Sequence, residues 1–490
     1  MLKNKYGGFL YWLWAAMAVL YFGSCKKDTL MTSGGAIRYG VDTFMFDTVF
    51  TQQGSSTRTL KIFNDESRKI KISSLRLRNG NNSRFYMNVN GVAGKSIADV
   101  EILAKDSIYV FLGVNIDPTN EDEPFMVYDE LIATMNGKEF VLPVYAYGQN
   151  AIYIVDSVLD TQTWDDPKPY VIIKNALVAE NATLTIPAGA RVYVHADSRL
   201  FVQGTLKIRG TLDNPVLFQG DRLDRLIYIG DHFGVSGEWG GVYFLSSSKN
   251  NEIDHATFIN GGASTKIGTG ATMAATIQLD SMGDANPKLR ITNTKIVNSQ
   301  GYGILAFKSS MYAENVLVAE CGSENIALLE GGDYTINNST FASYGWKYLQ
   351  RNNSRVASFT NFLAIDQNTY RATPLSLYMS NCIIWGSYES ELLCAKVNDY
   401  PAVINIKNSL LKYKDEDVES FVSFENIIRN QDPLFKVVPA GTGVNYHEWD
   451  FRLQENSPAR HSGATAGTLT TDLLGIPRHT PPSMGCYEFQ

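Results

Sequence analysis

The chain has 490 residues, with 43 Lys or Arg against 50 Asp or Glu, and its formal net charge is −7. Only 19% of the residues are charged, and no clustered basic face of the kind that binds nucleic acid is apparent, so we predict no nucleic-acid partner. Forty glycines and a 12% share of aromatic residues are typical of a turn-rich β protein.

The first 24 residues have the three parts of a secretion signal. Two lysines precede an apolar run over residues 9–22, which is shorter than the roughly 20 residues that span a bilayer. Cys25 follows Gly23 and Ser24, an arrangement that resembles the lipobox of bacterial lipoproteins, although Phe22 and Gly23 depart from its usual residues. The resemblance implies a lipid anchor on Cys25. The alternative is an ordinary secretory signal before an incidental cysteine.

Residues 25–40 are polar and predict a tether, and residues 41–150 then show short strands of period two. In "SIYVFLGVNI" one face of a strand collects the apolar residues Ile108, Val110, Leu112, Val114 and Ile116. This pattern predicts a β-sandwich. The segment resembles the Ig-like modules that precede β-helices in surface lipoproteins of Bacteroidetes-type bacteria, which implies a spacer or docking role.

Residues 151–436 contain a repeat of about 22 residues, the period of a solenoid coil. The units "NTKIVNS", "NVLVAEC" and "NSTFASY" begin at Asn293, Asn315 and Asn338. We place His255 in the same frame, and continue it through Asn361, Asn381 and Asn408. Such a unit cannot bury its apolar face alone, but stacked coils can. We therefore predict an all-β chain whose main domain is a right-handed parallel β-helix.

The repeated asparagine has a physical explanation. At a coil corner Asn tolerates the left-handed backbone conformation, and its amide can bond to the asparagines above and below. We therefore expect His255 and the asparagines to be structural. The functional alternative is a row of sugar-binding amides.

The stretch "TLTIPAGARVYVHADSRLFVQGTLKIRGTLDNPVLF" resembles the first coils of the pectin-lyase-like β-helix family, which includes lyases, hydrolases and proteins without known chemistry. Residues 437–490 are similar to the segment that closes extracellular β-helices, which implies a C-terminal cap over the last coil. That likeness rests on Leu453, Ser457, Pro458, Ala459, Gly463, Asp472, Gly475, Arg478, Gly485, Tyr487 and Glu488. We expect Asp472, Arg478 and Glu488 to form a structural ion-pair set.

Catalytic patterns of the family are weak in this chain. Its lyases use carboxylates that hold calcium beside an Arg or Lys, and residues of these types are scattered: Asp254, Asp280, Asp284, Lys308, Arg351, Arg355 and Arg371. Asp280 and Asp284 are a possible calcium pair in a turn-rich loop. The only Asp-Asp pair, Asp165-Asp166, precedes the repeats, and there is no Gly-His-Gly.

The segment 343–356 departs from the coil pattern and gathers aromatic and cationic residues. Aromatic rings stack on sugars and cations bind acidic glycans, so five residues form a candidate ligand-binding set: Tyr344, Trp346, Tyr348, Arg351 and Arg355. The alternative is a loop whose aromatic residues pack back on the helix. Four further cysteines, Cys321, Cys382, Cys394 and Cys486, are either disulfide partners or small buried residues.

The sequence favours a lipoprotein of the outer membrane, held at the cell surface, whose β-helix is a non-catalytic scaffold binding a glycan or an outer-membrane protein. We expect no cofactor, except that calcium is possible at the loop described above. The alternatives are a polysaccharide lyase or glycoside hydrolase with a divergent site, and a structural subunit of an outer-membrane assembly.

Overall fold

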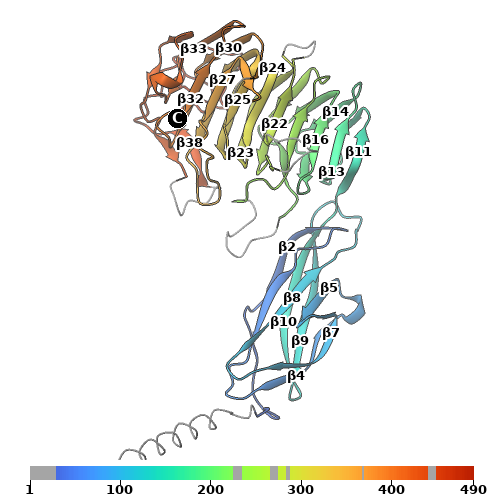
Figure 1. The fold of residues 1–490 in the computed structure, drawn as a ribbon. Coiled ribbons are helices and arrows are strands. Elements are labelled where there is room, and N and C mark those ends of the chain that lie inside the picture. Colours follow the sequence, from blue (N-terminus) through green and yellow to red (C-terminus); the bar gives the residue numbers. More distant parts are fainter. Residues whose placement is uncertain (1–28, 224–233, 265–273, 283–286, 367–368, 440–447) are drawn as a thin grey trace, which may run out of the picture. The chain divides into compact units, whose positions relative to one another are not determined.

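The computed structural model describes residues 29–490 except 224–233, 265–273, 283–286, 367–368 and 440–447 (Figure 1). Cys25 and Asp284 lie outside the described residues. The chain divides into two compact units between residues 149 and 150. The described part is built of strands with two short 3-10 turns, η1 (Gly80–Asn82) and η3 (Asp415–Asp417). It contains no helix long and apolar enough to cross a membrane.

The first unit consists of two five-stranded sheets that share one hydrophobic core. One sheet has the order β1 (Arg38–Tyr39), β3 (Arg58–Phe63), β8 (Ser107–Val114), β5 (Phe85–Val89) and β6 (Val92–Gly94). The other has the order β2 (Phe44–Phe50), β10 (Lys138–Gln149), β9 (Phe125–Met135), β4 (Ile70–Leu77) and β7 (Ser96–Ile102).

The period-two pattern of β8 is confirmed by its burial. Val110, Leu112 and Val114 are buried in the shared core, whereas Tyr109 and Phe111 on the opposite face are 48% and 43% exposed. Alternate side chains of a strand point to opposite faces of its sheet, so one apolar face per strand is sufficient to form a two-sheet core.

The second unit is a parallel β-helix whose strands stack in three faces. The first face contains β15 (Arg191–Val194), β18 (Val216–Gly220), β21 (Ala256–Ile259), β26 (Thr340–Ser343), β31 (Ile383–Gly386), β34 (Leu410–Leu411) and β36 (Ile428–Arg429). The second contains β16 (Arg199–Val202), β19 (Gly241–Phe244), β22 (Ala275–Asp280), β27 (Ala357–Thr360) and β32 (Leu392–Ala395).

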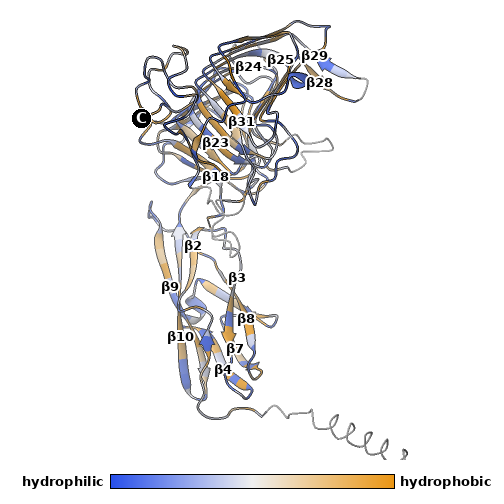
Figure 2. Cartoon of the chain, turned by 90° about the vertical axis from the view of Figure 1, so that its left-hand side faces the viewer, coloured by the Kyte–Doolittle hydropathy of each residue, from blue (hydrophilic) through white to orange (hydrophobic). Residues whose placement is uncertain are grey.

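The third face contains β12 (Gln162–Thr163), β14 (Thr183–Pro187), β17 (Thr205–Arg209), β20 (Asn251–Asp254), β30 (Leu375–Ser380), β33 (Ala402–Lys407) and β35 (Val422–Glu425). Longer strands turn corners and serve more than one face: β11 (Ile152–Leu159), β13 (Tyr170–Val178), β23 (Leu289–Ser299), β24 (Tyr302–Cys321) and β25 (Ile326–Asn337). Their inward side chains form one continuous core, and Figure 2 shows bands of hydrophobic residues on strands such as β23 and β31. The all-β prediction with a parallel β-helix is confirmed.

The predicted asparagine ladder is confirmed at the corner between the third and first faces. Asn293, Asn315, Asn338, Asn381 and Asn408 all have positive φ, between 45° and 55°. Nδ2 of Asn315 donates to Oδ1 of Asn293 at 3.0 Å, and the Asn381 amide bonds to Asn338 at the same distance. His255, with φ of 48°, is in register with Asn293.

The placement of Asn361 in this ladder was wrong. Its Nδ2 donates instead to the carbonyls of Val397 and Tyr400, and the ladder passes directly from Asn338 to Asn381. The coil between them is longer because it contains the hairpin of β28 (Phe362–Ala364) and β29 (Tyr370–Ala372). An insertion of about one repeat length kept the sequence spacing regular and so concealed the extra loop.

The C-terminal segment, for which a cap over the last coil was predicted, contacts the side of the β-helix through its described residues. It includes β37 (Phe435–Val437) and β38 (Asp450–Leu453), and it packs on the outside of the first face against Leu317, Ile383 and Trp385. Residues 464–476, here called the strap, follow the asparagine ladder: Asn381 bonds to Ala464, Asn338 to Ala466 and Asn315 to Thr471. The segment therefore covers the side of the solenoid.

The residues that matched a closing segment do have structural roles. Asp472 accepts the amides of Leu474, Ile476 and Glu488, each at 2.8 Å. The guanidinium of Arg478 donates to Oδ1 of Asn315 at 2.7 Å and lies 3.9 Å from the Glu488 carboxylate. All four described cysteines are buried and unbridged, and burial raises the pKa of the Cys382 thiol to about 12.

Candidate functional site

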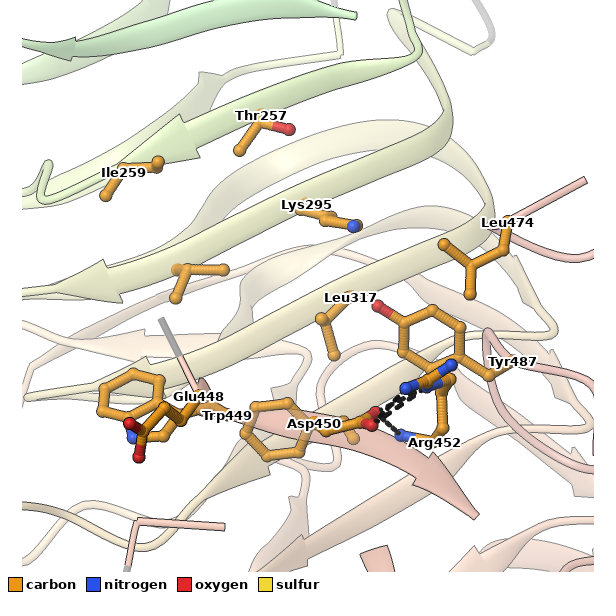
Figure 3. Close-up of a pocket in the computed structure, with 12 residues that line it drawn as sticks. Thr257, Ile259, Lys295, Leu317, Glu448, Trp449, Asp450, Arg452, Leu474 and Tyr487 are labelled. Atoms are coloured by element: carbon orange, nitrogen blue, oxygen red, sulfur yellow. Dashed lines mark hydrogen bonds and ion pairs between the residues drawn. The ribbon is translucent and has the colours of Figure 1, made fainter. Parts of the chain in front are cut away.

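A groove of about 540 Å³ lies between the first face of the β-helix and the C-terminal segment (Figure 3). Its floor is formed by outward side chains of three stacked strands: Thr257 and Ile259 of β21, Lys295 and Val297 of β23, and Leu317 of β24. These residues alternate with buried Phe258, Ile296 and Val318 of the core. The pleat of the strands thus places every second residue in the groove.

The opposite wall comes from β38 and the end of the chain. Asp450 and Arg452 form a two-pronged ion pair, with Nη2 to Oδ2 at 2.6 Å and Nε to Oδ1 at 2.9 Å. Burial acts to raise the pKa of Asp450, but the hydrogen bonds from Arg452 outweigh it and hold that pKa below its ordinary value. Asp450 therefore stays ionised and neutralises Arg452.

Lys295 differs from Arg452 because its ammonium group has no ion-pair partner among the residues that the structure describes. It is half-buried on the floor of the groove, and Figure 3 shows it on the strand side, facing the wall that carries Trp449 and Arg452. A cation in a water-restricted hollow attracts an anion more strongly than one in open solvent. The groove thus contains an ammonium group outside any ion pair with a described residue, together with aromatic rings and the exposed carboxylate of Glu448.

The aromatic part of the predicted segment packs back onto the molecule. Tyr344 contacts the cluster that joins the C-terminal segment to the first face. The Trp346 ring lies edge-on to Tyr348 and to Trp449, with centroids 5.0 and 5.3 Å apart, and its Nε1 donates to Asn298. Trp346 thus supports Trp449, one of the groove residues.

The two arginines of the candidate set do not face a ligand-binding surface. Arg351 is buried, and its guanidinium donates to both oxygens of Glu391 at 2.7 and 2.6 Å. Arg355 forms an ion pair with Asp417. Arg351, one of the five candidate ligand-binding residues, thus has a side chain that is only 2% exposed and already pairs with Glu391.

Tyr348 reaches a second hollow, of about 500 Å³, lined by Ser236, Ser264, Ala274, Gln300, Gly301, Tyr302, Ser323, Tyr348, Leu349, Gln350 and Asn352. Its described lining is rich in amides and hydroxyls, and none of the lining residues that the structure describes is charged. Burial raises the pKa of Tyr302 there to about 12, so this hydroxyl stays protonated and can donate. Of the five candidate residues, Tyr348 is the one that lines either of these two hollows.

The described residues around Asp280, where calcium was considered possible, lie close to the ammonium group of a lysine. The ammonium group of Lys288 donates to the carbonyls of Leu245, Ser246, Asp280 and Ser281, with distances of 2.7, 3.2 and 2.8 Å to Leu245, Ser246 and Ser281. Burial lowers the pKa of Lys288 to about 8. The main-chain oxygens that could bind a cation therefore already bind a protein ammonium.

The other charged residues weighed for a lyase site are dispersed. Asp254 accepts from Thr292 and Asn293 in the ladder, and Arg371 pairs with Glu330 beside the hairpin. Asp254, Arg371 and Lys308 do not line the groove.

Sequence reasoning missed Lys295, although its position as an outward-facing residue of the repeat unit "NTKIVNS" was a usable signal. The residues of the opposite wall gave no such signal, because they are far from the β-helix strands in sequence and approach them only in the folded chain.

Comparison with known proteins gives distant likenesses only. No family model and no curated protein matches the chain. The solved structure of pectate lyase Pel9A is similar at a TM-score of 0.31 and 11% identity, over 70% of this chain and 88% of that one. The structure of a family 123 glycoside hydrolase from Clostridium perfringens is similar at a TM-score of 0.16 and 11% identity. The match covers 23% of this chain and 26% of that one. The assignment to the parallel β-helix fold rests on the strand pairing itself.

Proposed function

We propose that the protein binds an acidic glycan in the groove without cleaving it. The ammonium group of Lys295 carries this proposal, because it forms no ion pair with a described residue and can pair with a uronate or sulfate group. Trp449 and Tyr487 add aromatic surface of the kind that packs on sugar rings. Among the described residues of the groove, Asp450 and Arg452 form a carboxylate–cation pair that is mutually satisfied and poorly placed to move protons.

The binding test uses a matched pair of lysine variants. Lys295→Met removes the charge and keeps most of the bulk, while Lys249→Met removes an exposed charge that lies outside the groove. Each protein is incubated with acidic and neutral polysaccharides and run on size-exclusion chromatography, with polymer length and protein traced together. We expect co-elution with an intact acidic polymer, at least tenfold weaker in K295M and unchanged in K249M.

The same experiment separates the alternatives. Shortened polymer would make the protein a lyase or hydrolase and would overturn the non-catalytic proposal. Equal binding by K295M and the parent chain would show that the glycan binds outside the groove. The amide-lined hollow around Tyr348 would then be the next site to test. Absence of binding to any polymer would favour a protein partner in the cell envelope.

We also propose that Cys25 carries a lipid that anchors the chain in the outer membrane, exposed at the cell surface. The sequence around Cys25 supports this, and acyl chains contribute about 0.8 kcal/mol per buried CH2. In bacteria fed a labelled fatty acid, we expect label on the parent chain and none on Cys25→Ala. Equal labelling of both would rule out this cysteine as the anchor, and protease accessibility on intact cells reports the orientation.

A further inference from the structure

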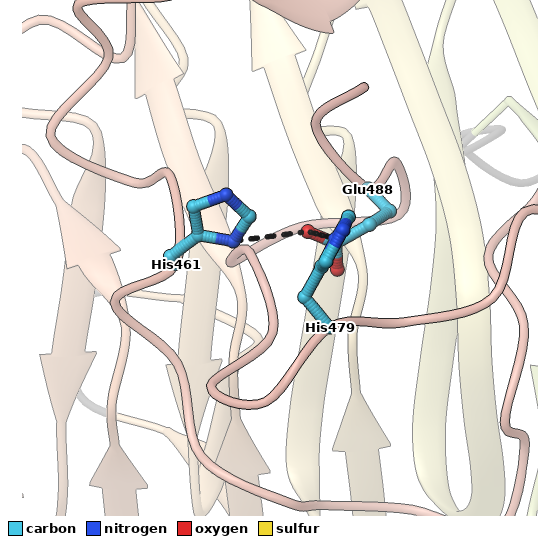
Figure 4. Close-up of side chains that lie close together, drawn as sticks. All are labelled: His461, His479 and Glu488. Carbon is cyan, nitrogen blue, oxygen red and sulfur yellow. Dashed lines mark ion pairs between the residues drawn. The ribbon is translucent and has the colours of Figure 1, made fainter.

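Two histidines converge on one buried carboxylate at the base of the strap (Figure 4). Nδ1 of His461 is 3.6 Å and Nδ1 of His479 is 3.3 Å from Oε1 of Glu488. Both rings turn toward this carboxylate in Figure 4, and one donor atom of each residue lies within 4.8 Å of the others. It is the one such group of three His, Cys, Asp or Glu residues in the described part of the chain.

The distances in this cluster are longer than those of a direct hydrogen bond. A charge-assisted N–H to O bond measures about 2.7–2.9 Å. The chain shows that geometry elsewhere, where Nδ1 of His195 lies 2.6 Å from Asp221. With bonds of about 2.0–2.1 Å, the ligand atoms of a tetrahedral zinc site lie about 3.3–3.4 Å apart. The His479–Glu488 separation of 3.3 Å matches such an edge, the His461–Glu488 separation of 3.6 Å is slightly longer, and the His195–Asp221 separation is well below it.

Glu488 is held in place as metal-ligating carboxylates usually are. Its side chain is fully buried, and Oε1 accepts from the hydroxyl of Ser483 at 2.5 Å and from the amide of Phe489 at 3.2 Å. The amide of Ser483 lies 3.2 Å from Oε1 and 3.0 Å from Oε2. These contacts fix the orientation of the carboxylate, and a metal bound at Oε1 would share that oxygen with the Ser483 hydroxyl. Arg478 approaches the other oxygen, Oε2, at 3.9 Å, so Oε1 is the oxygen turned to the histidines.

Both histidines keep an open side. The side chains of His461 and His479 are 33% and 55% exposed, so a metal bound between them would be reached from solvent and could keep a water as its fourth ligand. Nitrogen donors with a single carboxylate favour zinc-like ions over calcium, which prefers six or more oxygen ligands.

The three residues lie on both sides of the strap in the sequence. His461 lies three residues before the strap, and His479 and Glu488 follow it. One ion bound to all three would join the two ends of the strap and close it as a loop on the asparagine ladder. Such a cross-link removes conformational freedom from the undocked strap and so stabilises the docked one.

We propose that His461, His479 and Glu488 form a binding site for a zinc-class divalent ion that fastens the strap. The test uses the full chain in detergent, purified without a histidine tag and dialysed against a chelator. Zn²⁺ binding is then measured by calorimetry and by metal content. We expect one ion per chain, at least tenfold weaker binding in His479→Gln and in His461→Gln, and no change in the control His195→Gln. Calcium should not compete.

Hydrogen exchange provides a second measurement that does not depend on variants. Zn²⁺ should slow amide exchange in residues 462–478 of the parent chain and leave the first unit unaffected. Parent-like Zn²⁺ binding by both cluster variants would overturn the proposal, as would a parent chain that binds no zinc. In either case the two histidines would serve only to neutralise Glu488.

Discussion

Glu314 of β24 accepts hydrogen bonds from the amides of Thr468 and Leu469, and the first of these lies 154 residues further along the chain. The Thr468 amide lies 2.9 and 3.0 Å from the two carboxylate oxygens, and the Thr468 hydroxyl is 3.0 Å from Oε2. Glu314 is completely buried, so the strap supplies the hydrogen bonds that water would otherwise provide.

We therefore expect Glu314→Gln to release the strap while the solenoid stays folded. The amide group of Gln would present N–H donors to main-chain N–H donors, at a cost of about 1–3 kcal/mol for each unsatisfied buried group. Limited proteolysis should show new cleavage between residues 464 and 476. Glu425→Gln, at an exposed ion pair with Lys407, should leave the cleavage pattern unchanged. Parent-like resistance in E314Q would contradict the role given to this carboxylate.

Gly467 allows this close approach. Its φ is +77°, and a Cβ atom there would lie 1.9 Å from Oε1 of Glu314. Gly467→Ala should destabilise the docked strap by clash and by backbone strain together, the strain alone being about 1–2 kcal/mol. Gly137→Ala is the control, since its φ is +79° and nothing lies within 4 Å of the added atom. Thermal unfolding and limited proteolysis should show a larger loss of stability in Gly467→Ala than in Gly137→Ala. Equal losses would show that the clash with Glu314 does not contribute.

The Arg351–Glu391 pair is predicted to serve stability. Arg351→Met leaves the Glu391 carboxylate buried without its counter-charge, which costs about 3–5 kcal/mol. The amides of Tyr388 and Val356 bond to different oxygens of Glu391. The double variant Arg351→Met/Glu391→Gln removes both charges and keeps an acceptor for one of these amides, so it should recover part of the loss. Urea unfolding measures both. A single variant as stable as the parent would contradict this prediction.

Glu320 should make stability depend on pH. Burial raises its pKa to about 7 against the ordinary 4.5, although the amides of Tyr344 and Gly345 oppose the shift. Between these values the folded chain binds a proton that the unfolded chain lacks. The unfolding free energy should thus fall by about 3 kcal/mol as pH rises from about 4.5 to 7, at about 1.4 kcal/mol per unit.

This contribution is isolated by comparing the parent chain with Glu320→Gln. Urea unfolding at pH 5 and pH 8 gives the change for each protein, and the variant should lack the Glu320 part. Glu101→Gln removes a half-exposed carboxylate and should behave as the parent does. Identical pH dependence in the parent and E320Q would show that Glu320 does not titrate in this range.

The sequence predicted the coil repeat because each unit must bury an apolar face by stacking. The units that start at Asn293, Asn315 and Asn338 share the same pattern of apolar residues at regular spacing. The corner asparagines were equally local, since their left-handed backbone conformation follows from one residue at one turn. A second row was missed: Asn298 donates to Asn260 at 2.8 Å on another corner. Its members do not begin the repeat units and so escaped the alignment.

Sequence by itself thus determined the strands, the parallel stacking and the ladder, because these depend on residues near one another or one repeat apart. Tertiary structure decided where the last residues of the chain lie, and with them the groove, the strap and the His461–His479–Glu488 cluster. These features join segments separated by more than a hundred residues, or by a loop whose closure depends on docking. Lys295 is only an outward lysine of a strand until β38 lies opposite it and encloses its charge.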